Sequence, residues 1–185
     1  MNKKFYAFIP VILLVLVFIG CVIFNNSASQ HQKAASDFLK EYYSADDYKI
    51  LDEIKTVTDI ERLNAISESL YQEKYRETLT KEAYERLAAN RDIFEPEEIV
   101  KDFGCTLEFE NAEIKKHAET VKGNPVYSYN ARIKATLPNN EIKEFIETGT
   151  IELVRDEDNK WKVSRLNIAN RRNLYKSIEK IISDS

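Results

Sequence analysis

The spacing of apolar residues changes once along the chain, near residue 104. Before this point apolar residues recur every three or four positions, which is typical of amphipathic helices. The first stripe after residue 28 consists of Ala35, Phe38, Leu39 and Tyr42. Short second and third stripes follow, the second with Asp46 or Asp47 as its N-cap and the third opened by Thr58 and Glu61 in capping-box spacing. We therefore expect three or four helices over residues 28–92.

A fourth helix is predicted to begin at Thr80, a residue type that caps helix N-termini, and to end near Asn90. The segment that follows, RDIFEPEEIVKDFG, contains Pro96 and Gly104 and is predicted to be a loop. Beyond residue 170, Leu174, Ile178, Ile181 and Ile182 recur at helical spacing. This last pattern predicts an amphipathic C-terminal helix over residues 170–183.

From residue 104 to residue 168 apolar and polar residues alternate, as they do in strands with one buried face. The segment VYSYNARIKATL is the clearest case, and PNNE and DEDN are typical turn sequences between such runs. In the first strand the alternation slips between Phe109 and Ala112, which predicts a β-bulge. Gly149 is predicted to mark a bend in the third strand. Helices followed by strands predict an α+β domain, with helices packed on one face of a bent four-stranded antiparallel sheet.

An uncharged run from Phe5 to Phe24 precedes this domain. As a helix it would be about 30 Å long, which matches the thickness of a bilayer core. Lys3 and Lys4 before it predict a cytoplasmic N-terminus and an extracytoplasmic main domain. We therefore divide the chain into a cytoplasmic tip with a membrane anchor or signal segment over residues 1–26 and a single extracytoplasmic domain over residues 27–185.

Three interpretations of the apolar run stay open: an uncleaved anchor, a cleaved signal peptide, and a lipoprotein signal. The stretch VFIGC resembles a lipobox, which would make Cys21 the site of lipidation on the outer face of the membrane. The run continues past Cys21 without a polar residue, and this length favours the transmembrane anchor.

Charge and residue counts exclude several classes of function. Residues 27–185 hold 25 of the 27 Lys and Arg and all 31 Asp and Glu, a net charge of −6, which argues against a nucleic-acid partner. Cys105 is the only cysteine there, so no disulfide can form within this domain. The only histidines are His31 and His117, which argues against a histidine zinc site. The pair Arg171 and Arg172 is interpreted as a solvated helix end.

The acids in RDEDNKWKV do not have the spacing of a calcium loop, which needs oxygen ligands at positions 1, 3 and 5 and a glycine at 6. Counted from Asp156, position 5 is Lys160 and position 6 is Trp161. The acids are predicted to form the exposed tip of a β-hairpin, and Trp161 to point into the core.

The paired hairpins of YNARIKATLPNNEIKEFIETGTIELVRDEDNKWKV resemble the nuclear-transport-factor-2-like superfamily of cone-shaped α+β domains. The similarity is to extracytoplasmic envelope domains of that superfamily: the N-terminal domain of low-affinity penicillin-binding proteins, and the bitopic assembly component of conjugation and type IV secretion channels. It covers roughly residues 29–168, and the C-terminal helix departs from the minimal fold. The resemblance implies a bacterial envelope protein.

Enzymes of that superfamily hold a carboxylate base inside the cone, and we identify no inward carboxylate at strand spacing. We therefore assign no catalytic, cofactor-binding or metal-binding residues and expect no cofactor. Tyr42, Tyr71, Tyr127 and Tyr129 are the candidates to line a cavity. The expected function is a non-enzymatic, membrane-anchored assembly module that contacts envelope proteins or itself. The alternatives are binding of a small ligand or peptide in the cone and, less favoured, an isomerase-like enzyme.

Overall fold

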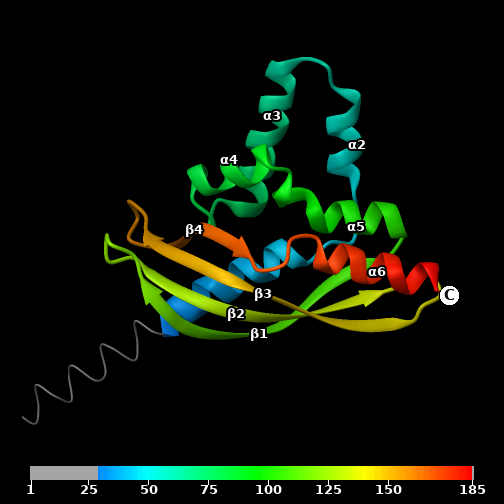
Figure 1. Cartoon of the computed structure of the whole chain (residues 1–185). Helices are drawn as coiled ribbons and strands as arrows, with labels where there is room; N and C mark the ends of the chain where they lie inside the picture. The colour runs from blue at the N-terminus through cyan, green and yellow to red at the C-terminus, as the bar shows by residue number, and fades with distance from the viewer. Residues whose placement is uncertain (1–28, 185) are drawn as a thin grey trace, which may run out of the picture.

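The computed structural model describes residues 29–184, and the predicted anchor and Cys21 lie outside these residues. Within residues 29–184, every helix is too short or too polar to cross a bilayer. The described residues form an α+β fold with six helices and one four-stranded antiparallel sheet (Figure 1). This confirms the α+β class and the four-stranded antiparallel sheet expected from the sequence.

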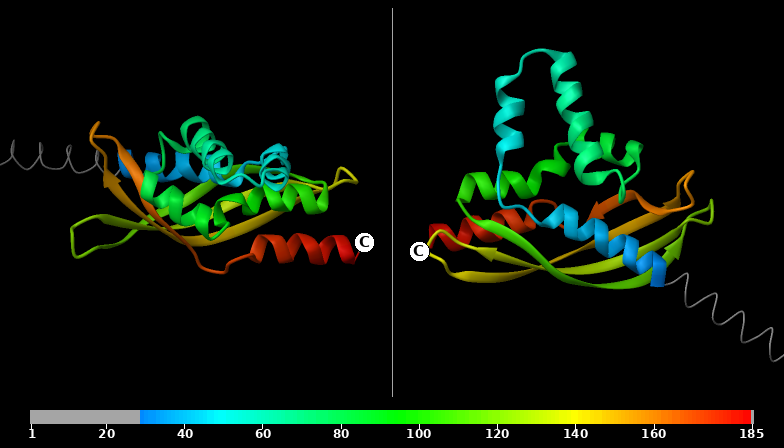
Figure 2. Two further views of the ribbon diagram at one scale, coloured as in Figure 1. Left: turned by 90° about the horizontal axis from the view of Figure 1, so that it is seen from above. Right: turned by 180° about the vertical axis from the view of Figure 1, so that it is seen from behind.

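The sheet is a simple meander in the order β1-β2-β3-β4. Its strands are β1 (Thr106–Glu119), β2 (Pro125–Thr136), β3 (Ile142–Arg155) and β4 (Trp161–Ile168). The predicted slip in β1 is confirmed, because the register with β2 shifts between Phe109 and Asn111. Figures 1 and 2 show the sheet strongly twisted and bent along its length. Bulges of this kind increase twist locally and let long strands curve around a core.

One face of the sheet is buried and the other is solvated. On β2 the alternation is regular, with Tyr129, Ala131 and Ile133 at most 1% exposed and Arg132 exposed between them. On the solvated face Arg132 lies between Glu144 (Nη1 to Oε2, 3.0 Å) and Glu110 (Nε to Oε2, 3.6 Å). The period-2 pattern of the sequence therefore corresponds to a core face and a charged outer face.

The N-terminal helix, described over residues 29–43, lies across the buried face of the sheet (Figure 2). Its predicted stripe is confirmed: Ala35, Phe38, Leu39 and Tyr42 are all at most 1% exposed. The helix begins beside the β1–β2 and β3–β4 hairpins, and at its far end Ala45 pairs with Leu107 of β1. Its direction across the sheet is therefore set at both ends.

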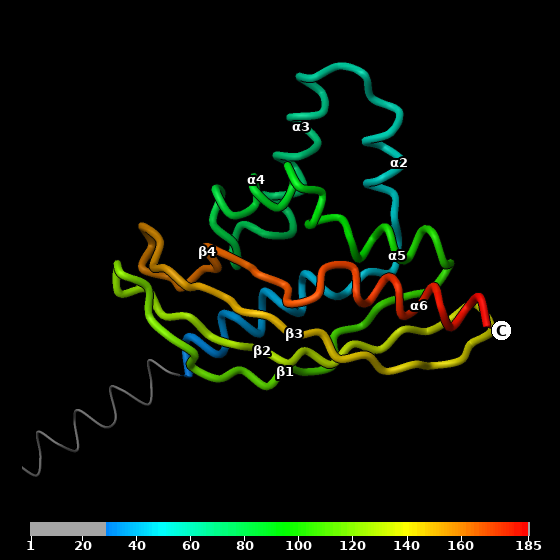
Figure 3. Tube along the Cα trace, in the orientation of Figure 1, coloured from blue at the N-terminus to red at the C-terminus, as the bar shows by residue number. Residues whose placement is uncertain are grey.

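Helices α2 (Lys49–Thr56) and α3 (Ile60–Leu70) form an arm that stands away from the sheet (Figures 1 and 3). Both predicted caps are wrong. The N-cap of α2 is Tyr48, whose side chain makes no capping bond, while Asp47 accepts from the Lys49 N–H. In α3 the N-cap is Asp59, whose carboxylate accepts from the Glu61 N–H at 3.1 Å. A capping box of Thr58 and Glu61 would have made Thr58 the N-cap, so the helix begins one residue later than the sequence predicts.

The predicted loop before the sheet is wrong. After the short π-helix η1 (Tyr71–Tyr75) and α4 (Lys81–Ala89), the chain forms a short 3-10 helix η2 (Asp92–Phe94) and then helix α5 (Glu95–Phe103). The helical part thus extends past residue 92. Pro96 lies in the first turn of α5, where its missing N–H costs nothing, and Gly104 ends the helix at φ 63°. The cap predicted at Thr80 is confirmed, since its hydroxyl accepts from the Ala83 N–H.

Helix α6 (Asn173–Ser183) is the predicted C-terminal amphipathic helix, and it buries Leu174 and Ile178. Strand β4 pairs with β3 only as far as Gly149, and α6 then continues alongside the remaining part of β3 (Figure 1). The side chains of α6 therefore close the core where the fourth strand has ended.

Candidate functional site

The acidic cluster before Trp161 forms a hairpin turn, as predicted. The Asp156 N–H donates to the Lys160 carbonyl at 2.9 Å, and Asn159 adopts φ 62°, a conformation that asparagine tolerates. The Asp156 carboxylate lies 2.9 Å from the Lys162 ammonium, which is the main reason that its pKa is lowered. Its charge is therefore compensated within the β3–β4 hairpin.

Trp161 is half-buried and packs against the main core. The centroids of the Trp161 and His31 rings are 4.1 Å apart, and the rings meet edge to face. The Arg155 guanidinium carbon lies 4.8 Å from the centroid of the Trp161 ring. The indole N–H is buried and has no hydrogen-bond partner among the described residues. Trp161 thus joins the β3–β4 hairpin to the start of the N-terminal helix.

The four tyrosines proposed as cavity lining have different hydrogen-bond partners in the structure. The Tyr127 hydroxyl contacts His31 Nδ1 at 2.7 Å, and the Tyr71 hydroxyl donates to the Leu79 carbonyl at 3.3 Å. Tyr42 donates to the Asp92 carbonyl at 2.8 Å, and the hydroxyls of Tyr43 and Tyr129 lie 3.2 Å apart. Of the four, Tyr42 borders a small enclosed space, together with Tyr43.

Two carboxylates lie at this tyrosine cluster, which corrects the sequence-based view that no carboxylate points inward. Glu147 of β3 is 3% exposed and accepts a hydrogen bond from the Asn173 side-chain amide at 2.9 Å. Glu95, at the start of α5, lines the same small space. The arrangement places two acids and two tyrosine hydroxyls, those of Tyr43 and Tyr129, on the core side of α5.

The pKa values of both acids are raised above the usual range of a glutamate. Burial, and then the like charge of Glu147, raise the pKa of Glu95 to about 7. Burial also raises the pKa of Glu147, although the Asn173 hydrogen bond opposes this, and burial raises the pKa of the Tyr129 hydroxyl. The space that they border measures only about 10 Å³, enough for one water molecule. In this form the cluster is closed to a substrate.

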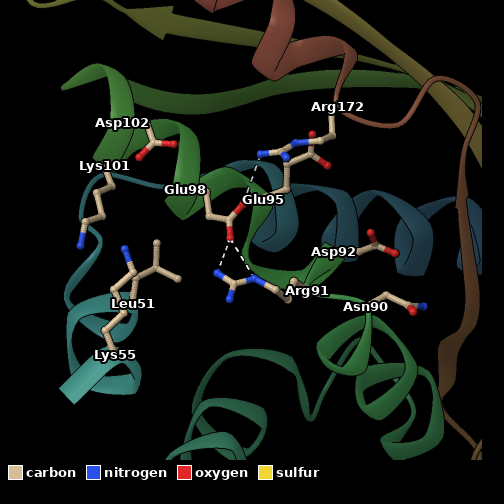
Figure 4. A pocket seen from close by; sticks show the side chains of 10 residues that line it. All are labelled: Leu51, Lys55, Asn90, Arg91, Asp92, Glu95, Glu98, Lys101, Asp102 and Arg172. Atoms are coloured by element: carbon tan, nitrogen blue, oxygen red, sulfur yellow. Dashed lines mark hydrogen bonds and ion pairs between the residues drawn. The ribbon is translucent and has the colours of Figure 1, made fainter. Parts of the chain in front are cut away.

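Glu95 also lines an open cleft of about 400 Å³ on the other side of α5 (Figure 4). The cleft lies between the base of the arm, the end of α4, α5 and the start of α6. Its ten lining residues are Leu51, Lys55, Asn90, Arg91, Asp92, Glu95, Glu98, Lys101, Asp102 and Arg172. Four of them are basic and four are acidic, so the cleft as a whole is nearly neutral.

Glu98 is the centre of the ion pairs in the cleft (Figure 4). Arg91 Nη2 lies 2.7 Å from one Glu98 oxygen, and Arg172 Nη2 lies 3.6 Å from the other. The neighbouring Arg171 lies 2.5 Å from Asp92. Arg171 and Arg172 were interpreted as a solvated helix end, and both side chains are exposed, at 63% and 55%. Their ion pairs also link the start of α6 to the helical layer.

One signal in the sequence could have identified Glu147. It has the same strand parity as Phe145, Gly149 and Ile151, so alternation alone places it on the core face. No comparable signal marks Glu95, because its burial depends on α5, which the pattern around Pro96 did not predict. Glu95 and Glu147 are 52 positions apart in the sequence. Their proximity therefore follows from the tertiary fold.

No family model and no curated protein matches this sequence. Among solved structures, a periplasmic fragment of TraM matches with a TM-score of 0.43 and 12% sequence identity. The match covers 79% of this chain and 96% of that structure.

Proposed function

We propose that this protein is a non-enzymatic interaction module, tethered to the membrane by residues 5–24 and displayed on its extracytoplasmic side. The observation that supports an interaction role is the α2–α3 arm. Ile60, near its tip, is 72% exposed, and Val57 and Leu63 beside it are only partly buried. Single exposed apolar residues are common on proteins, but Ile60 has two partly exposed apolar neighbours and belongs to an arm that projects from the sheet (Figure 1).

The charge of the arm favours a particular kind of partner. Residues 46–70 contain seven Asp and Glu against three Lys and Arg. Opposite charge accelerates encounter and disfavours wrong partners, while the buried apolar centre of an interface supplies most of the affinity. The proposed partner is therefore an envelope protein with a basic surface around an apolar patch.

A photocrosslinking amino acid at position 60 of the full-length chain, in intact cells, tests this proposal. We expect one discrete adduct at position 60 and none from the same amino acid at Asn139, an exposed residue on the β2–β3 turn. Charge reversal of the arm with Glu53→Lys and Glu61→Lys should weaken the adduct, because it slows the encounter with a basic partner. Equal labelling from positions 60 and 139, or an adduct indifferent to the charge reversal, would count against the arm as the docking element.

Acid–base catalysis is a second candidate, and the specific observation that favours it is Glu95. Its pKa of about 7 suits a general acid or base at neutral pH, and it lies between the open cleft and the buried Glu147. Small molecules can be screened by NMR for shifts at the Glu95 and Glu147 carboxyl carbons. Turnover of a binder that is lost in Glu95→Gln would favour an enzyme over the interaction module.

A further inference from the structure

The start of the described chain is fixed against one end of the sheet. The Gln32 side-chain amide donates to the Ile114 carbonyl of β1 at 3.0 Å. His31 contacts Tyr127, near the start of β2, and Trp161, the first residue of β4. The N-terminal helix therefore begins at the end of the sheet where the β1–β2 and β3–β4 hairpins turn. Figures 1 and 2 show both turns at this end and the C-terminus at the opposite end.

Very little chain separates this end from the proposed membrane anchor. Residues 25–28 lie between the apolar run that ends at Phe24 and the first described residue. Four residues, even when fully extended, reach at most about 14 Å. This end of the domain must then lie close to the surface of the outer leaflet, if residues 5–24 cross the membrane.

The turn between β1 and β2, which spans residues 120–124, has the chemistry of a headgroup contact. It is held by backbone bonds from the Thr120 N–H to the Asn124 carbonyl and from the Gly123 N–H to the Thr120 carbonyl. At its tip Val121 is fully exposed, at 108% of its reference area. Lys122 follows it, and among residues 29–184 no carboxylate lies within ion-pair distance of its ammonium group. A short apolar side chain beside an unpaired lysine suits the boundary between phosphate groups and acyl chains.

The neighbouring β3–β4 turn differs. It carries Asp156, Glu157 and Asp158, and its Lys160 is paired with Glu77 at 2.6 Å. Acidic residues are not attracted to phosphate groups. Both turns lie at the same end of the domain, but only the β1–β2 turn has side chains that suit contact with a bilayer.

We infer that the β1–β2 turn rests on the outer leaflet, with Val121 at the level of the headgroups and Lys122 beside lipid phosphates. This inference rests on the anchor of the proposed function. It gives the domain a second contact with the membrane besides its tether, so that the domain cannot rotate freely about residues 25–28. The arm is then presented in a restricted set of orientations.

The test uses the full-length chain in vesicles of phosphatidylethanolamine and phosphatidylglycerol, with Cys21→Ala to remove one thiol. Cys105 stays, since it is 2% exposed and shielded from reagents. An environment-sensitive fluorophore is attached at Val121→Cys and, as the matched control at the opposite end of the sheet, at Asn139→Cys. We expect a blue-shifted emission, quenched by headgroup-labelled nitroxide lipids, at position 121 and not at position 139.

Alkaline extraction of the same vesicles tests the membrane anchor separately from the contact of the β1–β2 turn. If the chain stays in the vesicles and the two positions give the same emission and quenching, the contact of the β1–β2 turn is overturned and the anchor stands. If alkali releases the chain, the anchor itself is overturned, and the inference that rests on it falls too. Adding Lys122→Glu to the position-121 variant should reduce the quenching at least twofold in vesicles rich in phosphatidylglycerol.

Discussion

The Tyr129 ring and its hydroxyl occupy the space where a side chain at Gly149, its cross-strand partner in the β2–β3 ladder, would begin. A β-carbon at position 149 would lie 2.7 Å from that hydroxyl oxygen and 2.2 Å from the Asn167 carbonyl oxygen. The ring thereby covers a strand position that has no side chain of its own. Gly149 is also the last residue of β3 that pairs with β4. The contact with Tyr129 therefore lies where β4 ends and the chain continues toward α6.

Gly149→Ala should therefore destabilise the protein by about 2–3 kcal/mol, because the added methyl group must displace backbone and a buried ring. Urea denaturation followed by circular dichroism measures the change. Gly123→Ala is the matched comparison: it has φ 81° but open space around it, so we expect a loss of only about 1 kcal/mol from backbone strain. Equal losses in the two variants would mean that the close approach at Gly149 is not a constraint.

The buried acids predict a pH dependence of stability. A carboxyl group whose pKa is raised on folding contributes stability below its unfolded pKa, near 4.5, and this contribution is lost as pH rises through the folded pKa. For Glu95 the window therefore runs from about 4.5 to about 7. We expect the free energy of unfolding to fall by on the order of 1–2 kcal/mol between pH 5 and pH 8, after allowance for solvent screening of this partly exposed group.

Glu147→Gln tests the origin of that dependence. The amide oxygen can still accept from Asn173, while the like charge that helps to raise the pKa of Glu95 is removed. The pKa of Glu95, read from its carboxyl carbon shift by NMR, should fall, and the loss of stability toward pH 8 should shrink. Glu157→Gln, on the exposed β3–β4 turn, should leave both quantities unchanged.

Lys74 and Glu97 form an ion pair at 2.7 Å, with side chains that are 26% and 9% exposed. Lys74→Met should cost about 2–3 kcal/mol, because it leaves a buried carboxylate without its partner. The double variant Lys74→Met, Glu97→Met should recover much of this loss. Lys33→Met removes an exposed pair with Asp37 and should change the free energy of unfolding by less than about 0.5 kcal/mol. A strictly additive double variant would contradict the coupling.

The cap of α3 gives a local prediction. Asp59→Ala removes the carboxylate that accepts from the Glu61 N–H and should cost about 1 kcal/mol. Hydrogen exchange of amides in residues 60–70 should accelerate, since the arm stands away from the sheet. Thr58→Ala should have little effect, because Thr58 is not the N-cap. The opposite ranking of the two variants would restore the capping box expected from the sequence.

The tip of the arm should be dispensable for folding. Ile60→Ser changes a side chain that is 72% exposed, so the free energy of unfolding should stay within about 0.5 kcal/mol of the parent. Ile66→Ala, in the same helix but at a side chain that is 8% exposed, should cost about 2 kcal/mol. Thermal denaturation compares them. A large loss from Ile60→Ser would mean that this residue packs within the arm and is not available to a partner.

Local patterns in the sequence were sufficient to identify most secondary structure. Alternation located the four strands, the slip near Phe109 located the bulge, and Thr80 located a helix start, because each depends on neighbours within a few residues. The prediction failed at α5 for a related reason: Pro96 was interpreted as a helix breaker, whereas it lies in the first turn, where proline is tolerated. The caps of α2 and α3 were each misplaced by only one or two residues.

The sequence by itself was therefore sufficient to predict the α+β class and the meander of hairpins. Its apolar run also favours a membrane anchor, which lies outside the described residues. Only the tertiary structure decided that α2 and α3 stand out as an arm, that Glu95 lies beside Glu147, and that the start of the N-terminal helix lies beside the β1–β2 turn. The physical reason is the distance along the chain between the residues that interact. Periodicity reports which face of a single element is buried, while burial of a charge or exposure of an apolar tip depends on which distant elements pack there.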